Sequence, residues 1–507
     1  MYTQNHLAAR LRRASVGADA APLFTSATTG EIRTYGEFFA NAERMAAALV
    51  QAGLQAGDRV AVQAPKTQAM IELYVATVLA GGVFLPLNTA YTDAELTYFL
   101  TDAAPRILVC DPGRQAGLGP IAAKAGVARV FTLAADENGT LVQARDAQAP
   151  GFVPVSRGPD DLAAILYTSG TTGRSKGAML THRALASNAE TLKDTWRFTA
   201  DDVLIHALPI FHTHGLFVAT NITLMAGSSC IFMAGFNADA ILRHMPLATV
   251  LMGVPTFYVR LLEAKGLARA AANIRLFVSG SAPLLAETHD RWRAITGHAI
   301  LERYGMTETN MNTSNPYDGD RRAGTVGFPL PGIEVIVTDP ADGAELPQGD
   351  IGVLEVRGPN VFAGYWQMPE KTREELRDNG FFITGDLGRI DSDGYVHIIG
   401  RGKDLIITGG YNVYPKEIEL LIDQLPGVSE SAVIGVPHTD FGEAVVAVVV
   451  PQPGATLSDA QVMAGIAADL ARFKQPKRVI IANELPRNTM GKVQKNILRD
   501  QHATLFA

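Results

Sequence analysis

The glycine- and hydroxyl-rich stretch 167-YTSGTTGRSKGAML-180 has the composition of an anion-binding loop. It lies between a predicted strand and a predicted helix, and it carries Arg174 and Lys176. Exposed backbone N–H groups in such a loop, together with hydroxyl donors and an ammonium, suit phosphate as a ligand. The stretch is not the GxxxxGK[ST] loop of ordinary P-loop enzymes, because Lys176 follows Ser175 and precedes Gly177. A phosphate-binding loop is therefore predicted, and an ordinary surface loop is the alternative.

Further motifs that could contribute to the same chemistry follow along the chain. They are 209-PIFHTHG-215, 279-SGSAPL-284, 304-YGMTE-308, 384-TGD-386, 400-GRGKDLI-406 and 486-PRNTMGK-492. The loop fits the pattern [ST]SG[ST]TGxPKG, except that Ser175 replaces proline. Loop and motifs together, in this order, resemble the adenylate-forming acyl-CoA synthetases. Segments 201–217 and 302–321 are most similar to the malonyl-CoA synthetases of that family.

The resemblance implies a reaction in two steps. A carboxylic acid attacks the α-phosphorus of ATP to give an acyl-adenylate and diphosphate, and the thiol of coenzyme A then displaces AMP. ATP, Mg²⁺ and coenzyme A are the expected cofactors and co-substrates. Both steps depend on stabilising charge more than on acid–base catalysis.

The resemblance also assigns the nucleotide and its metal ion to particular residues. Those expected to contact ATP are Thr168, Ser169, Gly170, Thr171, Thr172, Gly173, Lys176, Ser281, Ala282, Pro283, Tyr304, Gly305, Thr307, Asp386 and Arg401. Tyr304 is expected against adenine, Asp386 and Arg401 at the ribose. Glu308, with Thr172, is expected to hold Mg²⁺, because a hard carboxylate suits an ion that bridges phosphate oxygens.

Residues near the C-terminus are expected to separate the two steps. Lys492 resembles the lysine that neutralises charge between the attacking carboxylate and the α-phosphate, and Lys403 resembles the hinge about which a small domain rotates. Gly409 and Gly410 resemble the segment that lines the coenzyme A tunnel. The family also implies a lysine acetyltransferase as a partner acting on Lys492.

The acyl pocket is expected to contain His212, Ser279 or Ser281, Arg303 and Met306. A buried guanidinium needs an anion, and a second substrate carboxylate would provide one. Together with the resemblance, Arg303 predicts malonate as the acid and methylmalonate as a slower alternative. On the residues alone, an ion pair of Arg303 with Glu302 or with another internal acid is an equal alternative.

Composition restricts the other possible functions. The 507 residues carry a formal net charge of −7 and no concentrated Lys/Arg block, which argues against a nucleic-acid surface. The longest apolar run, 444–450, stops at Pro451, so no membrane span is expected. Cys110 and Cys230 lie in apolar contexts without metal-type spacing, and a cytoplasmic location is expected. The arginine-containing first eighteen residues predict an ordinary helix, with a transit peptide as the alternative.

The fold is predicted to be α/β. Strands alternate with helices from Arg59 to Asp111 and again over 203–284, a pattern typical of parallel βαβ units. A β-rich part is predicted over about 320–400. A boundary near residue 401 would separate an N-terminal domain, 1–400, from a small mobile α+β domain, 401–507, with helices over 413–424 and 457–473.

Three other functions are compatible with parts of this pattern. One is a synthetase for a short-chain or aryl monocarboxylic acid, in which Arg303 has a structural role. Another is a nucleotide-binding module without chemistry, which the presence of Lys176, Glu308, Asp386 and Lys492 disfavours. The third is an adenylation module of a peptide assembly line, disfavoured because the chain ends at Ala507 without a carrier domain.

Overall fold

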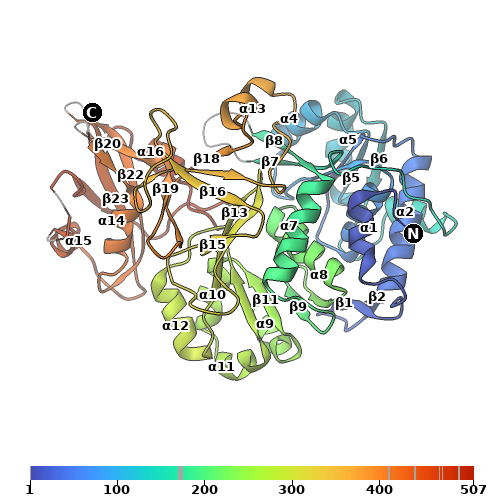
Figure 1. Cartoon of the computed structure of the whole chain (residues 1–507), viewed down its shortest axis with the longest axis horizontal. Helices are drawn as coiled ribbons and strands as arrows, with labels where there is room; N and C mark the ends of the chain where they lie inside the picture. Colours follow the sequence, from blue (N-terminus) through green and yellow to red (C-terminus); the bar gives the residue numbers. More distant parts are fainter. Residues whose placement is uncertain are drawn as a thin grey trace. The chain divides into compact units, whose positions relative to one another are not determined.

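The computed structural model describes residues 2–168, 175–408, 411–438, 441–467, 469–470, 472–488 and 491–506. The chain packs as two compact units (Figure 1). The first unit comprises Met1–Val335 and Val356–Phe382, and the second comprises Ile336–Glu355 and Ile383–Ala507. Residues 383–400 thus pack with the C-terminal part of the chain. The boundary near residue 401 is an expectation about motion, which packing does not test, and it stays a prediction.

The first unit contains a nine-stranded sheet in the order β15-β14-β13-β12-β11-β9-β10-β1-β2. Its strands are β1 (Pro22–Ser26), β2 (Ile32–Thr34), β9 (Val203–His206), β10 (Ser229–Phe232), β11 (Val250–Gly253), β12 (Leu276–Ser279), β13 (Leu301–Met306), β14 (Asn310–Ser314) and β15 (Phe328–Pro329). The six strands from β1 to β13 in this order are parallel, and antiparallel strands lie at both edges. The predicted α/β class is confirmed.

The same unit contains a six-stranded sheet in the order β6-β5-β3-β4-β7-β8. Its strands are β3 (Arg59–Gln63), β4 (Val83–Pro86), β5 (Ile107–Cys110), β6 (Arg129–Thr132), β7 (Leu162–Thr168) and β8 (Lys176–Thr181). All neighbours are parallel except β7 and β8, which form an antiparallel pair. Carboxyl ends of parallel strands lie at one edge of a sheet, where α/β enzymes place their ligands.

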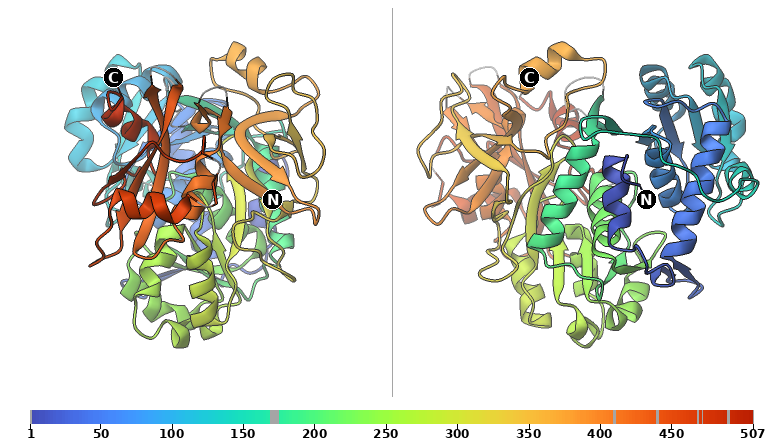
Figure 2. Two further views of the ribbon diagram at one scale, coloured as in Figure 1. Left: turned by 90° about the vertical axis from the view of Figure 1, so that its left-hand side faces the viewer. Right: turned by 45° about the vertical axis from the view of Figure 1, so that its right-hand side comes forward.

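Helices cover both sheets. The α-helices are α1 (His6–Arg13), α2 (Tyr35–Gln51), α3 (Gln68–Leu79), α4 (Asp93–Ala103), α5 (Gln115–Lys124), α6 (Thr140–Asp146), α7 (His182–Thr195), α8 (Thr220–Ala226), α9 (Ala238–His244), α10 (Pro255–Leu262), α11 (Leu267–Ala270), α12 (Ala286–Thr296) and α13 (Pro369–Glu375). Short 3-10 turns are η1 (Pro112–Arg114), η3 (Met245–Leu247) and η4 (Ala271–Asn273), and η2 (His214–Ala219) is a π-helix. Helix α7 touches strands of both sheets, and α1, α7 and α8 pack against one another (Figure 2).

Local sequence explains where two of these helices begin. Thr92 caps α4 and exchanges hydrogen bonds with Glu95, the reciprocal pattern of a capping box. Thr67 caps α3, whose twelve residues are all buried. The apolar residues of this helix are therefore distributed around it and are not confined to one stripe, as they would be in a helix with a solvent-exposed face. The arginine-containing N-terminal segment forms α1 with Leu7 and Leu11 buried, which agrees with an ordinary first helix.

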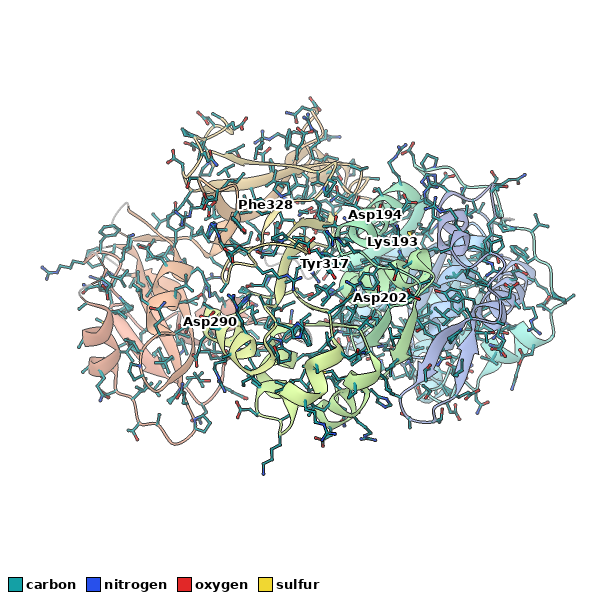
Figure 3. All side chains as sticks on the ribbon, turned by 60° about the horizontal axis from the view of Figure 1, so that its bottom comes forward. Lys193, Asp194, Asp202, Asp290, Tyr317 and Phe328 are labelled. Atoms are coloured by element: carbon teal, nitrogen blue, oxygen red, sulfur yellow. The ribbon has the colours of Figure 1, made fainter. Side chains whose placement is uncertain are left out.

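An ion pair links two strands of the nine-stranded sheet at their amino ends. This edge of the sheet lies opposite the edge formed by the carboxyl ends of the strands. Asp202, just before β9, pairs with Arg275, just before β12, at 2.7 Å. The Arg275 guanidinium also lies 5.4 Å from the centre of the Tyr317 ring (Figure 3). Strand β9 and strand β12 are therefore anchored at one end, while their other ends lead into the loops with the predicted site residues.

The second unit contains two sheets and three helices. A four-stranded sheet, which begins in the first unit, consists of β16 (Glu334–Thr338), β17 (Gly352–Arg357), β18 (Phe382–Ile390) and β19 (Val396–Arg401). A five-stranded sheet consists of β20 (Ile406–Thr408), β21 (Tyr411–Val413), β22 (Val428–His438), β23 (Gly442–Pro451) and β24 (Arg478–Ile481), with α14 (Pro415–Ile422), α15 (Asp459–Ile466) and α16 (Lys495–His502) packed on it and the turn η5 (Gly402–Asp404) before it. The part predicted to be β-rich, about 320–400, contains the four strands β16 to β19, but its residues 320–335 and 356–382 belong to the first unit.

The helix predicted over 457–473 is shorter than expected. It begins after the cap Ser458 and ends at Ile466. Gly465 lies in its last turn, where glycine is a poor helix former, and Leu425 packs within 2.6 Å of where a Cβ at that position would be. A side chain at position 465 would therefore collide with Leu425.

No helix in the described part of the chain is long and apolar enough to cross a membrane. The run 444–450 instead forms the buried centre of β23. Cys110 and Cys230 are both buried and unpaired, as expected from their apolar contexts.

Candidate active site

The predicted phosphate loop connects two strands. Thr168 ends β7 and pairs with Lys176, the first residue of the antiparallel strand β8. The expectation of a helix directly after the loop is wrong, because α7 begins only at His182, behind β8. Residues 169–174, which include the predicted contacts Ser169, Gly170, Thr171, Thr172 and Gly173, lie outside the described residues. The described strands on either side of the loop, β7 and β8, form an antiparallel pair.

Lys176 is held in a chain of charged and polar side chains. Its Nζ lies 3.0 Å from Glu375 Oε1 and 4.1 Å from the centre of the Tyr365 ring. The Tyr365 hydroxyl lies 2.5 Å from Glu375 Oε2 and 3.0 Å from Glu308 Oε1, so its single hydrogen can be donated to either carboxylate. The sequence prediction named Lys176 and Glu308 separately, and the structure brings them together through Tyr365 and Glu375.

Two residues of this chain, Tyr365 and Glu375, were not predicted from the sequence. Burial and the nearby carboxylate of Glu308 raise the pKa of Tyr365 strongly, so its hydroxyl keeps its proton. Burial alone would raise the pKa of Glu375, but hydrogen bonds from Tyr365, Lys371 and Lys176 lower it overall. No spacing rule relates residues 365 and 375 to residue 176. They meet because the segment of Tyr365 and Trp366 pairs alongside β8.

The surroundings of Glu308 fit a magnesium ion carried by nucleotide phosphates. The carboxylate is buried, and one carboxylate plus phosphate oxygens is a usual Mg²⁺ environment. Beside it, Thr309 Oγ1 and the Asn310 amide are buried without a hydrogen-bond partner among the described residues. Asn310 also has a left-handed backbone, with φ of 53°. Next to Glu308 in the chain, where the resemblance places Mg²⁺, there are thus further side-chain oxygen atoms that could act as metal ligands.

The predicted substrate residues gather at the carboxyl ends of β12 and β13. These strands pair in parallel with Ser279 opposite Glu302. Gly280 follows β12, and a Cβ there would lie 2.3 Å from Arg303 Cζ, so the guanidinium rests against bare backbone. Ser281 has a φ of 73°, which is strained for a residue other than glycine. Strain of this kind is typical of functional loops, and Ala282 and Pro283 continue the same turn.

Arg303 is a buried cation that forms no ion pair with any of the residues described by the structure. It is 4% exposed, and its Nε and Nη2 have no hydrogen-bond partner among the described residues. Burial, opposed by the Tyr258 hydroxyl, lowers its pKa to about 9, so it stays charged at neutral pH. Neighbouring strand residues point to opposite faces, so Glu302 is turned away toward His289, 3.7 Å away. The structural ion pair with Glu302 that the sequence allowed is therefore not formed.

Histidines of the segment 209–215 lie beside this guanidinium. His214 Nδ1 is 3.4 Å from Ser281 Oγ, and the backbone N–H of His214 donates to His212 Nδ1 at 3.5 Å. Burial, followed by the charges of Arg303 and of His212, lowers the pKa of His214 well below its ordinary value. His214 is thus neutral. Among the described residues, neither histidine belongs to a group able to hold a metal ion.

Strand β13 and its hairpin with β14 carry the remaining predicted contacts of the first unit. Tyr304 pairs with Thr313, and its hydroxyl lies 3.9 Å from the Met306 sulfur. Gly305 is required by packing, because a Cβ there would lie 1.8 Å from the Asn310 carbonyl oxygen. Thr307 lies in the turn between Met306 and Glu308, so the whole motif follows one bent strand end.

The second unit groups the other predicted residues. Asp386 and Arg401 face each other across β18 and β19, and their side chains are 2.6 Å apart. Lys492 is an exposed residue, but desolvation of its ammonium by the neighbouring groups and, after it, the charge of Arg401 lower its pKa, while Asp386 and Asp404 act in the opposite direction. Lys403 lies in η5. Gly409 and Gly410 lie outside the described residues.

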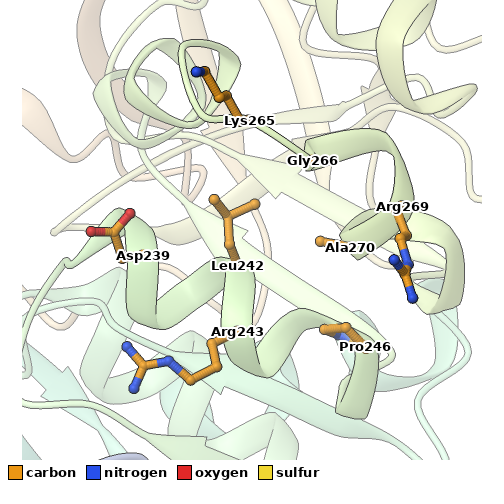
Figure 4. A pocket seen from close by; sticks show the side chains of 8 residues that line it. All are labelled: Asp239, Leu242, Arg243, Pro246, Lys265, Gly266, Arg269 and Ala270. Atoms are coloured by element: carbon orange, nitrogen blue, oxygen red, sulfur yellow. The ribbon is translucent and has the colours of Figure 1, made fainter.

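A surface pocket of about 470 Å³ lies elsewhere in the first unit, on α9 and α11 (Figure 4). Arg243, Lys265 and Arg269 give it a positive charge, with Asp239 beside them. None of the predicted site residues lines it. Its polar groups are surface side chains, so it lacks the buried donors found around Arg303.

Comparison with known proteins agrees with this geometry. Residues 12–366 match the family described as AMP-binding enzyme, and residues 417–492 match the AMP-binding enzyme C-terminal domain. The crystal structure of ATP-bound MatB from Rhodopseudomonas palustris is 61% identical, with a TM-score of 0.97 over 99% of this chain and 100% of that chain. A malonate–CoA ligase of Arabidopsis thaliana is 36% identical over 480 residues, 87% of this chain and 78% of the relative. A feruloyl-CoA synthase of Amycolatopsis is 36% identical over 476 residues, 93% of this chain and 94% of the relative.

Proposed function

Because this chain belongs to the AMP-binding enzyme family, we propose that it is an ATP-dependent malonyl-CoA synthetase. It converts malonate, ATP and coenzyme A into malonyl-CoA, AMP and diphosphate through a malonyl-adenylate, and methylmalonate is a slower substrate. The observation that carries the choice of acid is Arg303, a buried guanidinium with unpartnered donors at the end of β13. The second carboxylate of malonate pairs with this guanidinium, to which the described residues supply no anion.

In the first step, the malonate carboxylate attacks the α-phosphorus and diphosphate leaves. Lys176 and Thr168 contact the outer phosphates, and Thr307 contacts the α-phosphate. Glu308 would hold Mg²⁺, which would neutralise phosphate charge when bound. Lys176 exchanges its partner Glu375 for phosphate oxygens, and the single hydrogen of Tyr365 then remains available to Glu375 or to Glu308. Lys492 adds a positive charge between the attacking carboxylate and the α-phosphate.

In the second step, the coenzyme A thiolate attacks the malonyl carbonyl carbon and AMP leaves. Asp386 and Arg401 hold the ribose, and Tyr304 lies against adenine. Gly409 and Gly410 line the path of the pantetheine. Lys403 is the hinge that brings the second set of contacts into place, and the acetylation of Lys492 would abolish the first step by removing its charge. The enzyme works in the cytoplasm.

Replacing Lys403 with proline is expected to block thioester formation while sparing ATP–diphosphate exchange with malonate. Proline fixes φ and lacks an N–H, so the backbone at this position can no longer rotate freely. Stopped-flow or quenched-flow measurement of each half-reaction tests this. Lys403→Ala is the matched control, and it should retain both. Unchanged overall turnover in Lys403→Pro would remove the hinge role.

The deciding experiment is a thioester assay with purified protein, ATP, Mg²⁺, coenzyme A and a panel of acids. Malonate should give malonyl-CoA and equal amounts of AMP and diphosphate, with a lower rate for methylmalonate. Acetate and 4-coumarate test the alternative of a monocarboxylic acid. A higher kcat/KM for either of them than for malonate would contradict the proposal.

A further inference from the structure

Lys66 is a cation to which the proposed chemistry gives no role. It lies between β3 and α3, and its side chain is only partly exposed. Its Nζ donates to the His206 carbonyl oxygen at 2.8 Å and lies 3.1 Å from His206 Nδ1. It also lies 4.7 Å from the centre of the Phe232 ring. Burial lowers its pKa to about 7, with Cys230 acting in the opposite direction, and no carboxylate of the described chain is paired with it.

The position of Lys66 selects the tautomer of His206. In its protonated form Lys66 has donors only, so Nδ1 of His206 then accepts and the ring hydrogen is on Nε2. Nε2 lies 3.1 Å from the Gly215 carbonyl oxygen and can donate to it. The Thr220 hydroxyl donates to the same carbonyl at 3.0 Å. Burial, and after it the charge of Lys66, lowers the pKa of His206 well below its ordinary value, so the ring is neutral.

The carbonyl that His206 holds belongs to the segment that lines the acyl pocket. Gly215 follows His214 in the π-helix η2, an irregular helix type often found at functional sites. The chain here is tightly packed, because a Cβ on Gly215 would lie 2.0 Å from the Pro209 carbonyl oxygen. The residue before Gly215, His214, has its Nδ1 3.4 Å from Ser281 Oγ.

We propose that Lys66 is a positioning residue of the acyl pocket. It orients His206, His206 holds the Gly215 carbonyl, and the Gly215 carbonyl keeps His214 against Ser281 beside Arg303. Its effect on substrate binding rests on the proposed function, because that function makes this pocket the site of the second carboxylate. A solvated surface lysine would have no such effect.

The first test is the kinetics of Lys66→Met, which keeps the aliphatic length and removes the donors. We expect the KM for malonate to rise about tenfold, the effect of one lost hydrogen bond in the pocket, while kcat and the KM for ATP change less than about twofold. Lys66→Arg should restore the KM, because a guanidinium is also a pure donor. Lys265→Met, at an exposed lysine, is the matched control. An equal rise in both KM values would indicate general damage and overturn the proposal.

The second test does not depend on malonate. In protein labelled with ¹⁵N-histidine, the His206 signal, assigned by its loss in His206→Gln, should show the Nε2–H tautomer in the wild type and in Lys66→Arg. In Lys66→Met part of the signal should shift to the Nδ1–H form, because only the Gly215 carbonyl then favours Nε2–H. An unchanged tautomer in Lys66→Met would overturn the positioning role. If the wild type does not activate malonate, the proposed function fails, and the tautomer result still decides the role of Lys66.

Discussion

Arg303→Met is expected to lower kcat/KM for malonate by about 10²–10³-fold, the cost of removing one partner of a buried charged pair. The substrate's second carboxylate would enter a pocket whose guanidinium has been replaced by an apolar side chain. The loss should be mainly in KM for malonate, and the KM for ATP should stay within about twofold, because the nucleotide contacts lie on other residues. Steady-state kinetics with varied malonate and varied ATP measures both.

The same variant provides a check on folding. In the unliganded protein Arg303 carries a buried charge without an anion among the described residues, so Arg303→Met should unfold at the same or a higher temperature. Arg243→Met, at an exposed arginine, is the matched control and should keep full activity. If Arg303→Met activated malonate as well as the wild type, the dicarboxylate pocket would be wrong.

Lys492→Ala is expected to lower the rate of malonyl-adenylate formation by about 10²–10³-fold, the effect of removing one electrostatic group from a transition state. Thioester formation from supplied malonyl-adenylate should change by less than about twofold, because that step does not need the charge. ATP–diphosphate exchange measures the first step, and malonyl-CoA release from the adenylate measures the second. Lys477→Ala, an exposed lysine in the same unit, should leave both unchanged. Equal loss in both steps would assign Lys492 a structural role instead.

The pH dependence of the first step gives a second measure of Lys492. Desolvation of its ammonium and the charge of Arg401 lower the pKa of this exposed lysine below that of an ordinary lysine. The neutral form, which lacks the required charge, therefore appears at a lower pH than for a solvated lysine. The adenylation rate should fall as pH rises through this lowered pKa, and this alkaline limb should be absent in Lys492→Ala.

Much of the fold could be predicted because it depends on local patterns. Apolar strands alternate with helices along the chain, and Thr92 and Ser458 are of residue types that commonly cap the first turn of a helix. The run 444–450 is too apolar to lie on a solvent-exposed surface. The predicted ATP and acyl residues follow strand ends, where the topology of a parallel sheet gathers loops. Helix ends were less predictable, because Gly465 meets Leu425 from a distant part of the chain.

By itself the sequence determined the class of fold, the order of the motifs and which residue types could bind phosphate, metal and acid, because periodicity and short motifs are encoded by neighbours in the chain. Only the tertiary structure decided that Tyr365 and Glu375 lie between Lys176 and Glu308. It also decided that Glu302 points away from Arg303, toward His289, and that the Lys66 ammonium contacts His206. These partners are tens to hundreds of residues apart or on opposite faces of one strand. Their contacts depend on which elements the packing of the sheets brings together, and no spacing along the chain specifies that.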